Sequence, residues 1–177
     1  MNDEFGRTTD LLLEEIPIVI GRGVMNVTSS EPMTARFEEA VLGTIGFGGA
    51  EMRGSVSLVA DSAVWRSVDP AGFAADALTN AQVCDMVGEL CNMLVGGFKR
   101  RLGTYGVGIV SGIPTSAYGK LSLPVLPRAR ALHIATHQLQ TAAGIVYVRT
   151  EVLFRDGFVF PTDILLEATP PGMDLFF

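Results

Sequence analysis

The strongest pattern of apolar positions runs from about Asn80 to Leu102, where such residues recur every three or four positions. At 100° per residue, this spacing gathers six apolar side chains on one stripe of an α-helix. The stripe consists of Val83, Val87, Leu90, Leu94, Phe98 and Leu102. Asn80 fits the N-cap of such a helix, and Gly103 fits its end. The pattern therefore predicts a long helix over about 80–102 with one buried face.

A second stripe of this predicted helix carries polar and small residues. It consists of Asp85, Glu89, Asn92, Gly96 and one of the two cations Lys99 and Arg100. Glu89 lies about 200° around the helix from Val87, so the second stripe faces away from the core. Glu89 and Asn92 are i and i+3 neighbours, whose Cβ atoms are about 5–6 Å apart. We therefore expect a carboxylate and a carboxamide side by side in solvent.

Two adjacent glycines, Gly96 and Gly97, lie inside the same helical pattern. Each costs a helix about 1 kcal/mol relative to alanine. Such a cost indicates that the absence of a side chain at these two positions serves a purpose. The glycines either leave a clearing of bare backbone for another chain or allow close packing between two helices of this chain. The sequence supports both interpretations equally.

A second helical pattern lies near the N-terminus. Residues 8–24 (TTDLLLEEIPIVIGRGV) begin like a helix that one of its threonines would cap, and acidic residues fill its early turns. Pro17 would kink or end this helix, because proline has no N–H to donate. Asp61 would cap a short helix that continues through Trp65.

Alternating apolar residues predict two β-hairpins. One lies within residues 38–60, with the turn GGAE, and the other consists of strands at about 130–140 and 144–154, with the turn TAAG. Between the long helix and the second hairpin, residues 106–120 (GVGIVSGIPTSAYGK) have a composition typical of a loop.

The order helix, hairpin, helix, hairpin indicates an internal duplication. The spacing Asp-x3-Glu-x2-Pro-x3-Gly, which begins at Asp10, matches the spacing Asp-x3-Glu-x2-Asn-x3-Gly, which begins at Asp85, with an offset of 75 residues at every step. We therefore expect one α+β domain of two pseudo-repeats, about 8–68 and 80–154, followed by a tail, 155–177. In this pseudo-duplicated helix–hairpin fold, an antiparallel sheet carries two long helices packed together.

The composition fits one folded domain. Of the 177 residues, 48% are hydrophobic, so a sizeable core can form. The formal net charge of -6 argues against a nucleic-acid surface, which needs a basic stripe. The first residues given do not follow the pattern of a basic segment and then an apolar segment that predicts a secretory leader, and no apolar run reaches the roughly 18 residues that span a bilayer. We expect a cytoplasmic protein.

Its cysteines and histidines do not suggest a disulfide or a metal site. Cys84 and Cys91 lie seven residues apart on the predicted helix, about 10 Å along its axis, which is too far for a disulfide. His133 and His137 lie on one face of a predicted strand, about 13 Å apart, so they could not share an ion. We interpret both as surface histidines.

The second stripe of the long helix suggests a specific chemistry. A carboxylate can pair with a lysine of a partner, and a carboxamide can hold and orient a water molecule because it offers both a donor and an acceptor. A carboxamide is not a strong base. The pair Glu89 and Asn92 therefore suits hydrolysis of a substrate that is already reactive and is carried on another protein.

The motif D-x3-E-x2-N-x3-G on a long helix resembles the signature of the CheC/CheX chemotaxis phosphatases. The segment from Gly112 to Gly119 is also similar to the loop and strand that follow this helix in CheX-like proteins. The resemblance implies a phosphatase that removes phosphate from the phospho-aspartate of the response regulator CheY. It implies a homodimer that binds no metal of its own, because the receiver domain supplies the Mg²⁺.

The resemblance also implies roles for individual residues. Glu89 would dock the regulator through an ion pair with its active-site lysine, and Asn92 would position the attacking water. Asp85, Gly96 and Lys99 would belong to the partner-binding surface. The CheC branch has two active helices, but here Pro17 occupies the position that would need an asparagine. The resemblance therefore implies one active site, as in the CheX branch.

Other interpretations of the same residues remain open. A CheX-like domain could dock on a receiver domain or a flagellar motor component without turnover. It could also be a purely structural dimer domain, in which replacing Glu89 or Asn92 would have no effect. Taken alone, Glu89 could be an ordinary solvated carboxylate, and Asp85 could merely support the helix.

Overall fold

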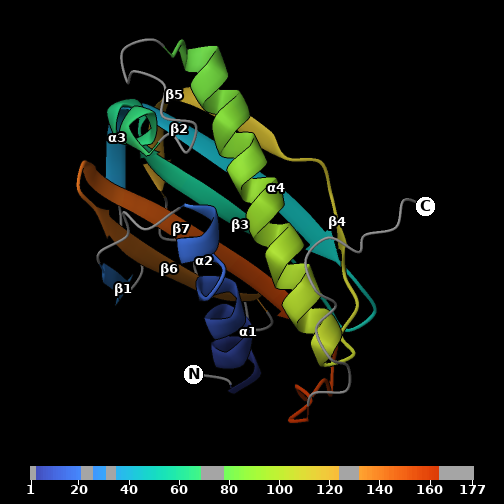
Figure 1. Ribbon diagram of the computed structural model, residues 1–177. Coiled ribbons are helices and arrows are strands. Elements are labelled where there is room, and N and C mark those ends of the chain that lie inside the picture. The colour runs from blue at the N-terminus through green and yellow to red at the C-terminus, as the bar shows by residue number, and fades with distance from the viewer. Residues whose placement is uncertain (1–2, 21–25, 31–34, 69–77, 124–131, 164–177) are drawn as a thin grey trace.

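The computed structural model describes residues 3–20, 26–30, 35–68, 78–123 and 132–163, and in these ranges the chain forms one antiparallel sheet and four helices. The helices are α1 (Asp3–Leu13), α2 (Ile16–Val19), α3 (Ser62–Ser67) and α4 (Asn80–Thr104). The strands are β1 (Asn26–Ser30), β2 (Ala35–Gly48), β3 (Met52–Asp61), β4 (Val110–Ser111), β5 (Thr115–Leu123), β6 (Leu132–Thr141) and β7 (Gly144–Phe154). Helices α1, α2 and α4 lie on the same face of the sheet (Figure 1). The predicted α+β class is confirmed.

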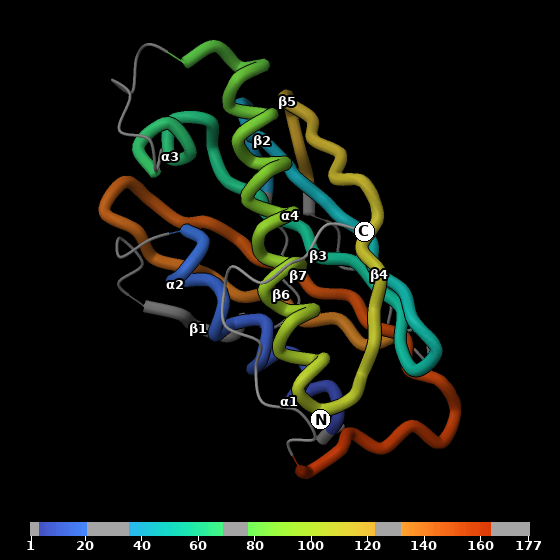
Figure 2. The backbone as a smooth tube through the Cα atoms, turned by 45° about the vertical axis from the view of Figure 1, so that its right-hand side comes forward, coloured from blue at the N-terminus to red at the C-terminus, as the bar shows by residue number. Residues whose placement is uncertain are grey.

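The strand order explains how the two halves of the chain combine. The order is β1-β6-β7-β3-β2-β4, and β5 also pairs with β2. Each hairpin, β2–β3 or β6–β7, therefore receives its outer strand from the other half of the chain. Figure 1 shows β1 and β5 at opposite edges of the sheet, and Figure 2 shows β5 beside β2. This exchange is consistent with the predicted duplication.

The core lies between α4 and the sheet. All six residues of the predicted apolar stripe of α4 are buried. Gly43 of β2 lets the helix approach closely, because a Cβ atom at this position would lie 2.8 Å from Cγ1 of Val87 and 2.9 Å from Sγ of Cys91. One helical turn beyond Leu94, the ring of Phe98 packs edge-on against Phe47, with 5.6 Å between the ring centroids. The sheet therefore holds α4 along several turns.

The first helix differs from its prediction. It begins at Asp3, so neither Thr8 nor Thr9 is an N-cap. Both threonines are buried inside α1, and their hydroxyls donate to the backbone carbonyls of Glu4 and Phe5 at 2.7 and 2.8 Å. Serine and threonine often donate to the preceding turn of a helix in this way. Their position in the sequence therefore did not mark the helix start.

The helix does break near Pro17, as predicted, but the break lies a few residues before the proline. Helix α1 ends at Leu13, and the short α2 then begins with Pro17 in its first turn. Proline is tolerated there because the first N–H groups of a helix have no partner within the helix. The first half therefore has a short, interrupted helix, and α4 is the single long helix in the described ranges.

Two segments form strands that composition did not predict. Residues 106–120 contain β4 and most of β5, both of which pair with β2. The strand that follows the long helix matches the CheX-like resemblance rather than the loop-like composition. The strand β1 lies in a stretch for which no strand was predicted. Of the predicted tail 155–177, residues 164–177 lie outside the described part of the chain.

In the described ranges, no helix combines the length and apolar character that a membrane crossing requires.

Candidate functional site

Helix α4 begins with a capping box. The Thr79 hydroxyl accepts from the backbone N–H of Gln82 at 3.3 Å, and the Gln82 side chain accepts from the Thr79 N–H at 2.9 Å. The predicted N-cap, Asn80, is instead the first residue of the helix, and its side chain accepts a hydrogen bond from Arg66. The cap satisfies two backbone groups that would otherwise lack partners and so stabilises the start of the helix.

The predicted polar stripe of α4 faces solvent. Asp85, Glu89, Asn92 and Lys99 are exposed. In the described part of the chain, neither carboxylate forms an ion pair, and the Asn92 side chain has no hydrogen-bond partner. These groups are therefore available to another molecule.

The two glycines of α4 have different surroundings. A Cβ atom at Gly96 would meet nothing within 4 Å, so Gly96 leaves a clearing beside the stripe. A Cβ atom at Gly97 would lie only 2.0 Å from a carboxylate oxygen of Glu15. The sequence left two interpretations open for these glycines, a clearing or close packing, and in the structure each interpretation applies to one of them. Gly96 provides open surface, whereas Gly97 allows close packing.

An ion-pair cluster joins the break between α1 and α2 to the last turns of α4. The side chain of Glu15 is 5% exposed, and one of its oxygens accepts a hydrogen bond from Nε of Arg101. Arg101 also reaches Glu14 at 2.6 Å, and Arg100 lies 3.9 Å from Glu15. A buried carboxylate requires such partners, because an unpaired buried charge is strongly destabilising. The first half therefore clamps the helix that carries the stripe.

In the first half, the residue that matches Glu89 belongs to this ion-pair cluster. Glu14 corresponds to Glu89 at the offset of 75 residues, but it is held by Arg101. Pro17 corresponds to Asn92, is exposed and offers no carboxamide. The described part of the first half therefore lacks a free carboxylate and carboxamide pair.

Two exposed apolar residues next to the stripe were missed by sequence reasoning. Met93 is 47% exposed, and Ile113, in the connection from β4 to β5, is 89% exposed. The helical wheel could have identified Met93, because it lies about 40° from Glu89. Ile113 gave no comparable signal, since its exposure depends on how the segment after α4 folds.

Both cysteines are free, as predicted. Burial raises the pKa of Cys91 to about 12, which keeps it as an unreactive thiol. Burial also raises the pKa of Cys84, with a smaller contribution from the neighbouring Asp85.

The surface interpretation of the histidines is wrong for His137. Its ring is buried on the helix side of β6, and burial lowers its pKa, although Asp10 of α1 acts in the opposite direction. His133 is half-buried and stacks on Phe5 of α1, with 5.3 Å between the ring centroids. Within the described ranges, no cluster of three or more potential ligand side chains could hold a metal ion.

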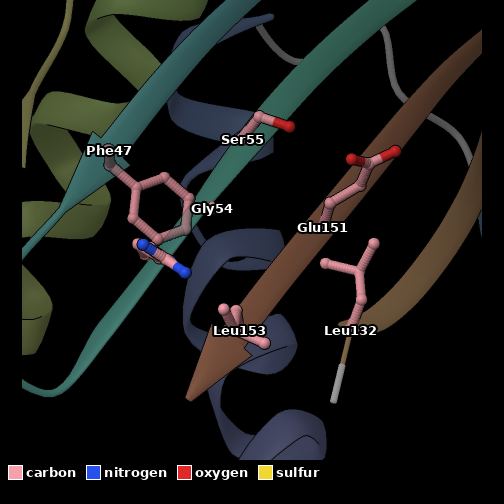
Figure 3. Close-up of a pocket in the computed structure, with 7 residues that line it drawn as sticks. Phe47, Gly54, Ser55, Leu132, Glu151 and Leu153 are labelled. Atoms are coloured by element: carbon pink, nitrogen blue, oxygen red, sulfur yellow. The ribbon is translucent and has the colours of Figure 1, made fainter. Parts of the chain in front are cut away.

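A shallow hollow of about 370 Å³ lies on the opposite face of the sheet from the helices (Figure 3). It is lined by Phe47, Arg53, Gly54, Ser55, Leu132, Glu151 and Leu153. None of the stripe residues contributes to it. The hollow and the exposed stripe of α4 are therefore separate features.

Comparison with known proteins identifies the family. Residues 41–138, more than half of the chain, match the family model "Chemotaxis phosphatase CheX", and this region includes all of α4. Among curated proteins, none matches the sequence.

Three solved structures support the same fold. The chain is similar to a CheC-like superfamily protein from Shewanella sp. PV-4, with 22% identity, a TM-score of 0.64 and coverage of 86% of this chain and 99% of that chain. It is similar to the chemotaxis protein CheX from Vibrio vulnificus, with 23% identity, a TM-score of 0.61 and coverage of 85% and 96%. It is also similar to a chain of the CheX–CheY–BeF3–Mg²⁺ complex from Borrelia burgdorferi, with 16% identity, a TM-score of 0.55 and coverage of 88% and 100%. With the family match, the fold and the motif on α4 in agreement, the chain belongs to the CheX family of chemotaxis phosphatases.

Proposed function

We propose that this chain hydrolyses the phospho-aspartate of a CheY-like receiver domain, with Glu89 and Asn92 as the working pair. The observation that carries the proposal is the surface of α4. A capped, continuous helix presents an exposed carboxylate and an exposed carboxamide one turn apart, beside the clearing at Gly96. Family membership and the CheX–CheY complex of Borrelia burgdorferi support a receiver domain as the substrate.

The chemistry requires little more than positioning. Phosphoryl transfer to water passes through a loose transition state, so an oriented water and compensation of the phosphate charge suffice. In our proposal, Asn92 holds the water in line with the bond that breaks. Glu89 accepts a hydrogen bond from the lysine of the receiver domain and fixes its orientation. The receiver domain supplies the Mg²⁺.

The neighbouring residues of the stripe complete the docking surface in this proposal. The clearing at Gly96 gives the receiver backbone room to approach. Asp85 lies one turn before Glu89 and adds negative charge facing the lysine, and Lys99 lies beyond Gly96 at the other end of the stripe. The charge on the stripe therefore changes sign along the helix, which would fix the direction in which a partner docks.

The test compares wild-type protein with Asn92→Ala. Candidate receiver domains are phosphorylated with Mg²⁺ present, and loss of the acyl phosphate is followed with and without the protein. We expect the wild-type protein to accelerate the loss. With Asn92→Ala, we expect the acyl phosphate to be lost at its spontaneous rate. If both proteins bind the phosphorylated receiver domain and neither accelerates the loss, the chain is a docking module. If neither protein binds, the proposal is wrong.

Two further expectations belong to the same proposal. The CheX-like resemblance implies a homodimer, which analytical ultracentrifugation of the full chain would detect as twice the chain mass. The sequence also predicts a cytoplasmic location, where receiver domains are phosphorylated, and cell fractionation would test this.

A further inference from the structure

Two large apolar side chains lie exposed on either side of the Glu89 and Asn92 pair. Met93 lies about 40° from Glu89 on the side of α4 away from Asn92. On the opposite side, Gly88 lies one turn before Asn92. A Cβ atom at Gly88 would lie 3.9 Å from Cβ of Pro114, so the residue before this proline, Ile113, is beside the helix. The polar pair therefore has Met93, 47% exposed, on one side and the segment that carries Ile113, 89% exposed, on the other.

The segment that carries Ile113 is anchored on both sides. The N–H of Gly112 donates to the carbonyl of Gly46 at 2.8 Å, and the strands β4 and β5 on either side both pair with β2. Pro114 fixes its own φ angle and restricts Ile113 to extended conformations. Ile113 is therefore held outward by its backbone, and a partner that contacts it has little conformational entropy to remove.

Charge indicates what this surface fits. Asp85 and Glu89 lie between the two apolar side chains and have no ion-pair partner in the described part of the chain. A partner that fits must bring a basic group to the centre of the surface and apolar contacts to both sides. Contacts around a central ion pair exclude water and so strengthen it.

We infer that Met93 and Ile113 form two apolar contacts that hold the receiver domain over Glu89 and Asn92. This inference rests on the proposed function and adds a requirement on the partner. The receiver face must carry apolar residues on both sides of its lysine and phosphorylated aspartate. A receiver domain with charged residues at these places is rejected, so the two contacts select among the receiver domains of one cell.

The test uses the full chain and a receiver domain loaded with beryllofluoride and Mg²⁺, which mimics the phosphorylated state. Met93→Gln and Ile113→Gln should each weaken binding about tenfold in a titration and raise KM by a similar factor, while kcat for dephosphorylation stays unchanged. The matched control is Val159→Gln. Val159 is 74% exposed and follows Phe158, and the next residue, Phe160, contacts Tyr105 at the far end of α4. This end lies about 24 Å from Glu89 along the helix. The control should bind as the wild-type protein does.

The outcomes separate this inference from the proposed function. If Asn92→Ala loses turnover while Met93→Gln and Ile113→Gln bind like the wild-type protein, the inference is wrong and the phosphatase remains. If the two variants lower kcat and leave binding intact, the inference is also wrong. If the wild-type protein neither binds nor dephosphorylates any receiver domain, both proposals fail.

Discussion

Glu89 and Asn92 lie on a continuous helix of 25 residues, α4. The matching positions in the first half hold Glu14 and Pro17, where the chain leaves the 11-residue α1 and enters α2. Glu89 has no ion-pair partner in the described part of the chain, whereas Glu14 pairs with Arg101 at 2.6 Å. The same spacing thus yields an open surface in one half and a clamp in the other.

The difference shows that residue identity alone does not define such a site. A carboxylate becomes available to a partner only when its helix continues past it and no cation of the same chain holds it. In the first half, the break at Pro17 brings two carboxylates against the end of α4, where Arg101 lies between them. The first half therefore positions the helix of the second half.

The largest effect is expected at Asn92, and its matched position in the first half, Pro17, provides the control. Asn92→Ala should lower the accelerated rate of dephosphorylation about 100-fold or more, the cost of removing one positioning donor in other enzymes. Pro17→Ala should leave the rate unchanged, because neither proline nor alanine offers a carboxamide at the position that matches Asn92. Single-turnover loss of the acyl phosphate measures both. An equal loss in the two variants would mean that both halves act in the chemistry.

Replacing Arg101 tests the clamp. Arg101→Met should lower the free energy of unfolding by about 2–3 kcal/mol, because it leaves the carboxylate of Glu15 buried without its main partner. Arg100→Met is the matched control. Arg100 is 55% exposed and 3.9 Å from Glu15, so its loss should cost less than about 0.5 kcal/mol. Urea denaturation measures both variants. If both have the same small effect, the clamp contributes nothing to stability.

Acid should destabilise the folded protein through His137 of β6. Burial lowers the pKa of His137 below its ordinary 6.5, so the unfolded chain binds this proton more readily than the folded chain does. The free energy of unfolding should therefore decrease as the pH falls below about 6.5, by at most about 1.4 kcal/mol at pH 5.5 from this residue. His137→Leu should reduce the difference measured by urea denaturation at pH 7.5 and 5.5. An unchanged difference would show that other groups cause it.

The smallest of these effects concerns the start of α4. Thr79→Ala should lower the free energy of unfolding by about 1 kcal/mol, because it removes the hydroxyl of the capping box. Thr79→Ser keeps that hydroxyl and should stay within a few tenths of a kcal/mol. Thermal unfolding followed by circular dichroism compares them. The same loss in both variants would place the stabilising contact elsewhere on Thr79.

The sequence predicted the helices and strands in which apolar residues recur at a regular spacing. The apolar stripe of α4 and the two hairpins gave clear patterns, and the structure places all of them close to the predicted residues. The exposure of Glu89 and Asn92 also followed from the helical period. Their roles in catalysis remain a prediction. The predicted helix boundaries differ from the structure, although the Thr79 and Gln82 spacing was a readable capping signal.

The remaining features depend on contacts between distant parts of the chain. β5 forms in a segment rich in glycine and serine because β2 supplies its hydrogen bonds. The burial of His137 depends on α1, which lies far away in sequence. The different surroundings of Gly96 and Gly97 depend on Glu15. Local sequence patterns contain none of this information.

The exchanged outer strands also determine when the protein can fold. Asn26 of β1 pairs with Gln140 of β6, more than 100 residues later in the chain. During synthesis, β1 therefore remains unpaired until nearly the whole domain has emerged from the ribosome. Contacts of such high sequence separation slow folding, because a long loop must close before any pairing energy is gained. A truncated product that ends before β6 would expose an unpaired edge and invite aggregation.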